Sequence, residues 1–420
     1  MAAALVQSYR YAEPSVVERA ASGARLVLAT SSPGDTPNPF FFTGKVAAPK
    51  RIADGMLLVA RVARTRFYIP PAMLAKILAA ADPVVTCTKD SVRFESFSAC
   101  AGVYARFDLG PHAFEVEHAS PGTTNVDFNP EMRAVLAKTR TTDAFRLSVG
   151  REAVKVATTR GGAIERKVPL PVRWVRSFGE VQAILASMKE RLRIDAAHAR
   201  KFLKGLPKTS RGASWVVRAG QGLRLSQIAT KDGVQAGGLH RLGVLVDAAN
   251  DATELVVYGD EHGSSAWELV LPDARFVMVL SPSAERGFSG EGRLLFDLAG
   301  SQLEAAVASL RAKLRWQTKI VSDDARALAV LASRGLVGYD LAAGAYFHRE
   351  LPFSIGDLES LHPRLEAARK LVETKAEIPY RVVLEDDGYS CTCAWFSKHG
   401  QTSGPCKHVL ARSMEAEEAG

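Results

Sequence analysis

The residues best suited to chemistry in this sequence lie near its C-terminal end, where three of the five cysteines occur close together. Cys391 and Cys393 are separated by one residue, and Cys406 and His408 repeat that spacing after a spacer of twelve residues. Three thiols and one imidazole form a complete ligand set for a tetrahedral zinc ion, with no position left for an activated water. The segment therefore predicts one structural Zn2+ ion. His399 lies in the spacer and is an alternative fourth ligand, although His408 fits the repeated spacing.

The elements expected around this ligand set are two strands and a helix. Residues 380–384, an Asp-Gly turn and a returning strand at 389–393 indicate a hairpin. Residues two apart on a strand project from one face, so both hairpin cysteines can reach one ion. Pro405 begins a helix with Cys406 at its N-terminus, where the helix dipole favours a thiolate. The expected unit is a small ββα zinc finger.

A small apolar cluster of Trp395, Val409 and Leu410 is expected beneath the ion, too small to hold its fold without metal. The order Cys-x-Cys, spacer, Cys-x-His, with Gly-Pro-Cys-Lys-His at 404–408, resembles the SWIM zinc finger over about residues 376–412. The longer part of the chain is similar to bacterial SWIM zinc finger proteins that carry such a scaffold before the finger. This resemblance implies an interaction module that contacts DNA or other proteins.

The rest of the chain is expected to be an α+β scaffold. With 420 residues, of which 47% are hydrophobic and 24% charged, the sequence can form two or three domains with their own cores. Alternation of apolar residues over 92–117 predicts hairpins, and 70–81 has a helical pattern that Pro71 opens. We predict a β-rich two-domain scaffold with a small C-terminal finger, divided into 1–175, 176–375 and 376–420.

The middle part contains a basic helical belt, an α+β core and one segment with two interpretations. Apolar residues at helical spacing over 178–192 predict a helix that continues through Leu192. The helix and hairpin pattern of 323–353 is similar to the last helix and wing of a winged-helix fold, which would place Arg334 and Arg349 near DNA. The alternative, which we favour, is an ordinary helix and hairpin of an α+β domain.

Positive charge is concentrated in the same region. The whole chain has a formal net charge of +9, whereas residues 160–224 contain fifteen Lys or Arg and four acidic residues, a net of +11. Such a region suits a phosphate backbone or an acidic protein partner, and the alternative is a solvated face that maintains solubility. The candidate nucleic-acid-binding residues are Lys189, Arg191, Arg193, Arg200, Lys201, Lys204, Lys208 and Arg211.

We find no catalytic constellation and expect a protein that is not an enzyme. Residues 287–291 do not match the glycine pattern of a nucleophile elbow, and the Asp-Glu-His sequence at 260–262 indicates a solvated turn between two glycines. The odd number of cysteines and the lack of a signal-peptide pattern predict a reducing cytoplasm. No apolar run approaches the roughly 18 residues of a membrane span.

Three hypotheses describe the function. The first is a zinc-stabilised protein that contacts nucleic acid, DNA more than RNA, through the basic belt. Residues 373–420 contain five basic and eight acidic residues, so backbone contact is expected at the belt rather than at the finger. The second is a protein–protein adaptor for an ATPase-containing complex, without nucleic-acid binding. The third is an enzyme with an accessory finger.

Overall fold

The computed structural model describes most of the chain from Phe40 onward, together with four short strands before it. The helix predicted over 70–81 and the candidate residue Arg211 lie outside the described residues. The described residues are 9–11, 16–20, 23–27, 31–33, 40–65, 83–126, 128–168, 172–209, 212–282, 287–300, 303–352, 362–385 and 388–419.

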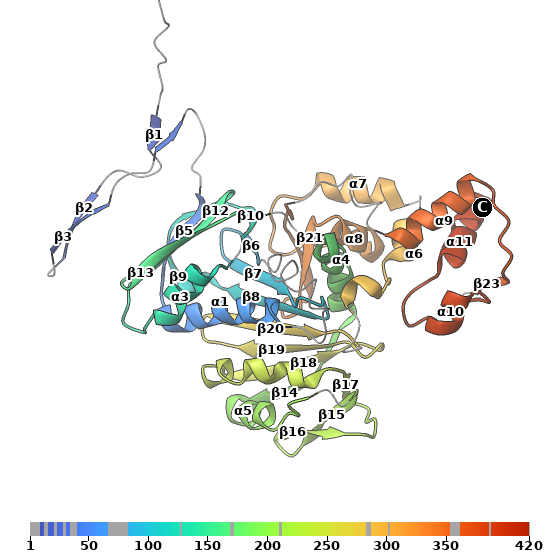
Figure 1. Ribbon diagram of the computed structural model, residues 1–420, viewed down its shortest axis with the longest axis horizontal. Helices are drawn as coiled ribbons and strands as arrows, with labels where there is room; N and C mark the ends of the chain where they lie inside the picture. Colours follow the sequence, from blue (N-terminus) through green and yellow to red (C-terminus); the bar gives the residue numbers. More distant parts are fainter. Residues whose placement is uncertain are drawn as a thin grey trace, which may run out of the picture.

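The largest element is an antiparallel sheet with the strand order β10-β6-β7-β8-β20-β19-β18-β14 (Figure 1). Its strands are β6 (Val84–Cys87), β7 (Val92–Phe97), β8 (Val103–Leu109), β10 (Gly122–Asn125), β14 (Lys189–Asp195), β18 (Glu254–Gly259), β19 (Ser265–Val270) and β20 (Ala274–Leu280). At its centre β8 pairs with β20, so strands from both sides of residue 175 share one sheet. The division of the chain at that residue remains a prediction.

Four smaller sheets complete the scaffold. The first has the order β13-β12-β11-β5-β9, the second has the order β16-β15-β17, and two pairs of short antiparallel strands precede them. Their strands are β5 (Phe40–Val46), β9 (Phe114–Ala119), β11 (Phe145–Gly150), β12 (Ala153–Thr158), β13 (Gly161–Arg166), β15 (Ser214–Ala219), β16 (Gly222–Ser226), β17 (Val234–Ala236), β1 (Tyr9–Tyr11) with β4 (Ser31–Pro33), and β2 (Val16–Ala20) with β3 (Gly23–Val27).

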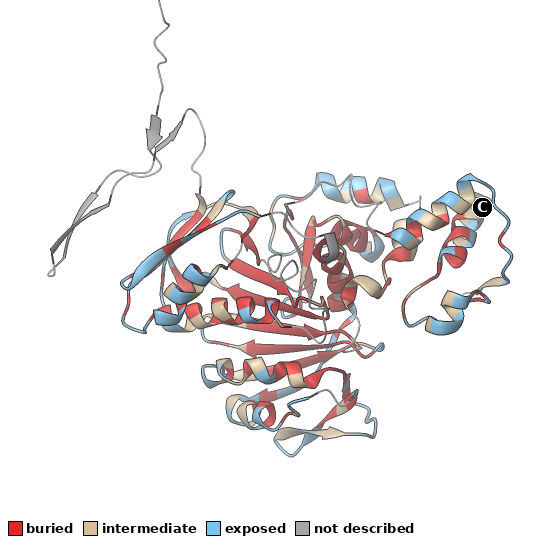
Figure 2. Ribbon diagram, viewed as in Figure 1, coloured by how far each residue is buried: buried red, intermediate tan, exposed pale blue. Residues whose placement is uncertain are grey.

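Helices cover one face of the eight-stranded sheet and form the main core with it. The helical elements in this core are α1 (Pro49–Ala63), α3 (Pro130–Lys138), α5 (Ala196–Lys204) and the 3-10 segment η2 (Leu239–Leu245). Helix α1 approaches β8 closely at Gly55, where an added Cβ would lie 2.2 Å from the Phe107 ring. A larger residue at that position would displace the helix. Figure 2 shows the buried strands and the buried sides of these helices.

The opposite face of the sheet is covered by α4 (Val172–Ser187), which packs against Val256 and Tyr258 of β18. The prediction of a helix through Leu192 is wrong, because α4 ends at Ser187 and β14 follows it. Leu192 and Ile194 are buried two residues apart, the period of a strand, and β14 pairs with β18. Tertiary pairing therefore overrides the helical spacing at this point.

The helix and hairpin predicted over 323–353 are α8 (Ala325–Ser333), β21 (Val337–Asp340) and β22 (Ala345–His348). The interpretation that places Arg349 near DNA is wrong, because this side chain is 0% exposed and its Nη1 lies 2.5 Å from Glu95 Oε1. Arg334 is paired with Glu304. The hairpin thus packs on the scaffold and its arginine is used internally.

A buried ionic interface joins this hairpin to the sheet, and it comprises Arg93, Glu95, Arg106, Asp108, Asp340 and Arg349. Arg93 Nη2 donates to Asp340 Oδ2 at 2.8 Å, and Arg106 Nη1 donates to the Tyr339 carbonyl at 2.5 Å. Burial by itself would raise the pKa of the Glu95 carboxyl, but Arg349 and the Tyr104 hydroxyl hold that pKa below its usual value. These charges are therefore compensated within the protein.

The C-terminal helices form a separate layer beside the sheets (Figure 1). They are α6 (Leu295–Ala299), α9 (Pro363–Glu373), α10 (Ala394–His399) and α11 (Lys407–Ala419), whereas α7 (Glu304–Ala312) packs against α8. A cluster that includes Leu295, Leu365, Leu410 and Met414 holds α6, α9 and α11 together. Among the described residues, no helix combines the length and the apolar character needed to cross a membrane. The α+β prediction is confirmed.

Candidate metal centre

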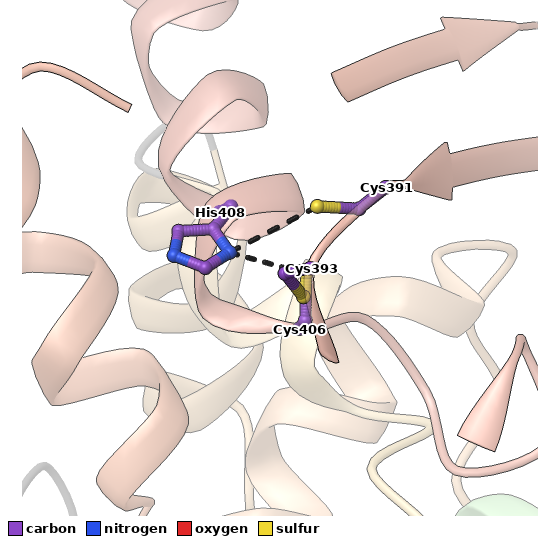
Figure 3. Close-up of side chains that lie close together, drawn as sticks. All are labelled: Cys391, Cys393, Cys406 and His408. Carbon is purple, nitrogen blue, oxygen red and sulfur yellow. Dashed lines mark hydrogen bonds between the residues drawn. The ribbon is translucent and has the colours of Figure 1, made fainter. Parts of the chain in front are cut away.

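The four predicted ligands lie together at one point of the C-terminal layer (Figure 3). The ligand atoms of Cys391, Cys393, Cys406 and His408 all lie within 4.8 Å of one another, and all four residues are buried. His408 Nδ1 is 3.9 Å from Cys391 Sγ and 4.0 Å from Cys406 Sγ. Ligands of a tetrahedral zinc ion lie roughly 3.6 Å apart. The set therefore fits one structural zinc ion.

The local elements differ in one respect from the expected ββα unit. Strands β23 (Val382–Glu385) and β24 (Gly388–Cys391) form the hairpin, but Cys393 lies beyond β24 and caps the extra helix α10. Its Sγ accepts a hydrogen bond from the Phe396 N–H at 3.4 Å. The spacing of two residues therefore works through a strand end and a helix cap. The spacer itself gave no apolar period long enough to predict α10.

The alternative ligand His399 is directed elsewhere. Its ring lies against Trp395, with 4.7 Å between the ring centroids. The ring of His408 lies against Tyr380 at the same separation, while its Nδ1 faces the cysteines. Among the described residues, the geometry thus selects His408 as the fourth ligand.

Protonation of the buried thiols opposes metal binding. Burial raises the pKa of the Cys391 thiol to about 12. Burial also raises the pKa of Cys406, although the N–H groups of His408 and Val409 at the start of α11 act in the opposite direction. The helix position predicted for Cys406 is thus present, but its effect on the pKa is smaller than that of burial. For Cys393 the Phe396 N–H helps to lower the pKa despite burial. Zinc must displace thiol protons, so its affinity falls as the pH falls.

The apolar support of the site was predicted in part. Val409 is buried with the three cysteines, and Trp395 and Phe396 pack against them. Leu410 instead belongs to the neighbouring cluster of α6, α9 and α11. Phe296 on α6 contacts the site cluster and stacks edge-on with Tyr389 at 5.2 Å between centroids. The finger is therefore built onto the scaffold and shares its core.

Arg364 on α9 fixes the loop that leads to Cys406, and no sequence pattern indicated this role. Its Nη1 donates to the carbonyls of Ser403 at 2.6 Å and of Pro405 at 3.0 Å. The guanidinium also lies 4.8 Å from the centroid of the Trp395 ring. One side chain thus links both halves of the ligand set to α9.

The eight candidate residues of the basic belt are dispersed over different elements. Lys189, Arg191 and Arg193 lie on the edge strand β14, and Arg193 is paired with Glu190 and Glu254. Arg200, Lys201 and Lys204 lie on α5, and Arg200 donates to the carbonyl of Ala249. Lys208 is exposed after α5. The basic belt is therefore divided between the strand β14 and the helix α5. Arg193 and Arg200 already interact with other groups of the protein.

An open groove lies between α5 and the β15–β16 hairpin. Its volume is about 550 Å³, and it is lined by Lys201, Arg224 and His198 together with apolar and neutral residues. None of the described lining residues is acidic. Asp195 lies beside the groove and is bound to His198, with 2.7 Å between Oδ2 and Nδ1. Arg224 was within the basic region of the sequence but was not among the candidate residues.

Comparisons with known proteins give a family for the finger. No curated protein matches the chain. Among solved structures, the proliferating cellular nuclear antigen of Entamoeba histolytica is 10% identical, with 58% of this chain and 99% of that chain covered and a TM-score of 0.39. The PCNA of A. fulgidus, bound to the C-terminal region of FEN-1, is 12% identical, with 57% and 98% covered and a TM-score of 0.38. Likenesses at this level decide nothing about the present chain. The SWIM zinc finger family matches residues 380–411, which contain the complete cluster of three cysteines and a histidine, and this C-terminal segment is a SWIM zinc finger.

Proposed function

We propose that this protein is a non-enzymatic, cytoplasmic nucleic-acid-binding protein in which the SWIM finger is a structural zinc module. The proposed contact surface comprises α5 and the β15–β16 hairpin, and its ligand is a phosphate backbone, DNA more than RNA. The observation that carries the proposal is the groove lined by Lys201 and Arg224 without a carboxylate among its described lining residues. A groove with one sign of charge focuses the field on an anionic ligand.

The lysines of this surface differ in their pairing from Arg193 on the neighbouring strand β14. Lys201, Lys204 and Lys208 are exposed and form no ion pair with the described residues. Arg193, in contrast, is held by two glutamates. Cations without an internal partner are available to phosphates and release counterions when they bind. The proposed surface is accordingly centred on α5, with β14 at its margin.

The test is binding of a fluorescent DNA duplex, measured by anisotropy as a function of salt concentration. Lys201→Glu/Lys204→Glu should weaken binding at low salt at least about tenfold and reduce the slope of log affinity against log salt by roughly 2, near 0.9 per lost phosphate contact. The matched control is Lys313→Glu/Lys319→Glu, which changes the net charge equally on two exposed residues elsewhere. No binding of the unaltered protein at low salt, or equal losses in both variants, would contradict the proposal.

A protein–protein adaptor is the second candidate function, and the finger favours it. Its acidic excess between residues 373 and 420 does not suit a phosphate backbone, and Tyr380 and Leu384 are large apolar residues exposed on it by 39% and 42%. If the finger alone contacts partners, the DNA arm of the experiment should show no affinity at any salt concentration. Truncation of the finger should then remove a partner that the α5 variants retain.

A further inference from the structure

The finger carries a strand with one unpaired edge. β23 and β24 form a sheet of only these two strands. The outer edge of β24 is partly covered, because Gln401 Nε2 donates to the Tyr389 carbonyl at 2.9 Å. The outer edge of β23 has no corresponding cover among the described residues. A two-stranded hairpin is marginal by itself, and an open edge is a template for another strand.

The hydrogen-bond pattern identifies which backbone groups face that edge. The Thr392 N–H donates to the Arg381 carbonyl at 3.1 Å, so position 381 faces β24. In an antiparallel pair these inward positions alternate, so Val383 and Glu385 also face β24. Val382 and Leu384 therefore direct their N–H and C=O groups outward. None of these four groups has a hydrogen-bond partner among the described residues.

The side chains of this strand do not protect the edge. Edge strands are commonly blocked by lysine, proline or a bulge. β23 contains none of these and offers Leu384, which is 42% exposed. Arg381, exposed just before β23, and Glu385, exposed at its end, carry opposite charges, and neither forms an ion pair with the described residues. The edge is thus apolar in the middle and has opposite charges at its two ends.

We propose that the occupant of this edge is β23 of a second copy of the chain, paired antiparallel about a two-fold axis through Val383. In this register Val382 lies opposite the partner's Leu384, and the outward backbone groups of the two residues satisfy each other. Arg381 lies opposite the partner's Glu385, and the symmetry produces this ion pair twice. The two hairpins become one four-stranded sheet.

The self-complementarity favours a second copy over an unrelated peptide. In this one register the outward N–H and C=O groups of the two strands lie opposite each other. The same register also places each Arg381 opposite a Glu385. The paired strands bury far less than the roughly 1,600 Å² of a standard stable interface. The dimer is therefore weak, and it forms in proportion to protein concentration.

The experiment is sedimentation velocity of the zinc-loaded full chain over a wide range of concentration. Glu385→Arg alone and Arg381→Glu alone each place like charges opposite one another, and each should weaken the dimer at least about tenfold. The swapped variant Arg381→Glu/Glu385→Arg restores both ion pairs and should restore the dimer. Zinc content measured on every variant verifies that the finger is intact.

Three results would overturn the proposal. The first is an unaltered protein that stays monomeric at every concentration. The second is a dimer that neither single variant weakens, which would place the interface elsewhere. The third is weakening by both single variants without recovery in the swapped variant, which would show that Arg381 and Glu385 do not lie opposite one another in the dimer.

Discussion

The C-terminal third of this protein is attached to the rest of the fold at two buried clusters of polar side chains, which we call anchors. The two anchors compensate their buried polar groups in different ways. The ionic interface beneath β21 and β22 buries arginines and carboxylates that compensate one another, with Arg349 and Glu95 both 0% exposed. The zinc site buries three thiols and an imidazole, and the thiols bind metal only as thiolates. The first anchor is complete within the chain, whereas the second needs an ion. Folding of the two regions should therefore respond to different perturbations.

Each anchor also includes a contribution that destabilises the folded state, and the physical origin of this contribution differs between the two. Buried ion pairs lose hydration, and removal of one partner leaves an uncompensated charge in the interior. Several polar atoms of the ionic interface, among them Arg93 Nε and Glu95 Oε2, already have no hydrogen-bond partner. The zinc site has the opposite weakness, because its thiols are easily buried when protonated but bind metal only as thiolates. One anchor is sensitive to mutation and the other to metal and pH.

Removal of zinc should have the largest effect, and only on the second anchor. Binding of structural zinc contributes about 10–16 kcal/mol to small finger peptides at pH 7. We expect a strong chelator, or Cys391→Ser with Cys406→Ser, to release the ion and to expose the amides of α10 and α11 in hydrogen exchange. Amides of β21 and β22 should keep their protection. Equal loss of protection in both regions would show that the anchors are not independent.

Arg349→Met should break the first anchor and leave the second intact. The substitution leaves the Glu95 carboxylate buried without its arginine partner. This should lower the free energy of unfolding by about 3–5 kcal/mol. Urea unfolding measures this loss, and zinc content should remain one ion per chain. Adding Glu95→Gln to Arg349→Met should recover part of the loss. Arg334→Met, at a partly exposed pair with Glu304, is the matched control and should cost less than about 1 kcal/mol.

Glu180 on α4 is a buried carboxyl outside both anchors, and it tests how burial alone affects stability. Burial raises the pKa of this group to about 7, although the Arg293 N–H donates to its Oε2 at 3.0 Å. The folded state therefore holds a proton that the unfolded state loses near pH 4.5, so stability from this group declines as the pH rises from 4.5 through 7. Glu180→Gln should raise the free energy of unfolding at pH 8 by up to about 3 kcal/mol and change little at pH 5. A benefit that does not depend on pH would contradict this assignment.

Arg364→Gln should produce the smallest of these effects and should act on zinc affinity rather than on the fold. The substitution removes the donors to the Ser403 and Pro405 carbonyls that position Cys406. Partners of this kind typically change metal affinity about 10- to 100-fold. Competition with a chromogenic chelator measures the change. Arg369→Gln on the same helix is the control, and its effect should be well below tenfold.

The sequence predicted the second anchor and missed the first, for a physical reason. Zinc ligands recur at short spacing in the sequence. The segment from Cys391 to His408 therefore contains the whole ligand set, and the site can be predicted from that segment alone. The partners of the ionic interface are single residues on distant strands, and nothing local distinguishes Arg93 from a surface arginine. The same limit explains β14, where the spacing of apolar residues continued a helical pattern and pairing with β18 decided the structure. Charge density located the basic belt but could not show that Arg193 is paired.

The ionic interface also determines the order in which parts of the chain can pack together during synthesis. Arg93 and Asp340 are separated by 247 residues. A chain synthesised from its N-terminus at about 5–20 residues per second therefore carries Arg93 for roughly 12–50 s before its partner exists. During that interval Arg93 and Glu95 on β7 lack the partners that Asp340 and Arg349 later supply. The β21–β22 hairpin closes this face and is made late in synthesis, so the scaffold is completed only shortly before the zinc finger is made.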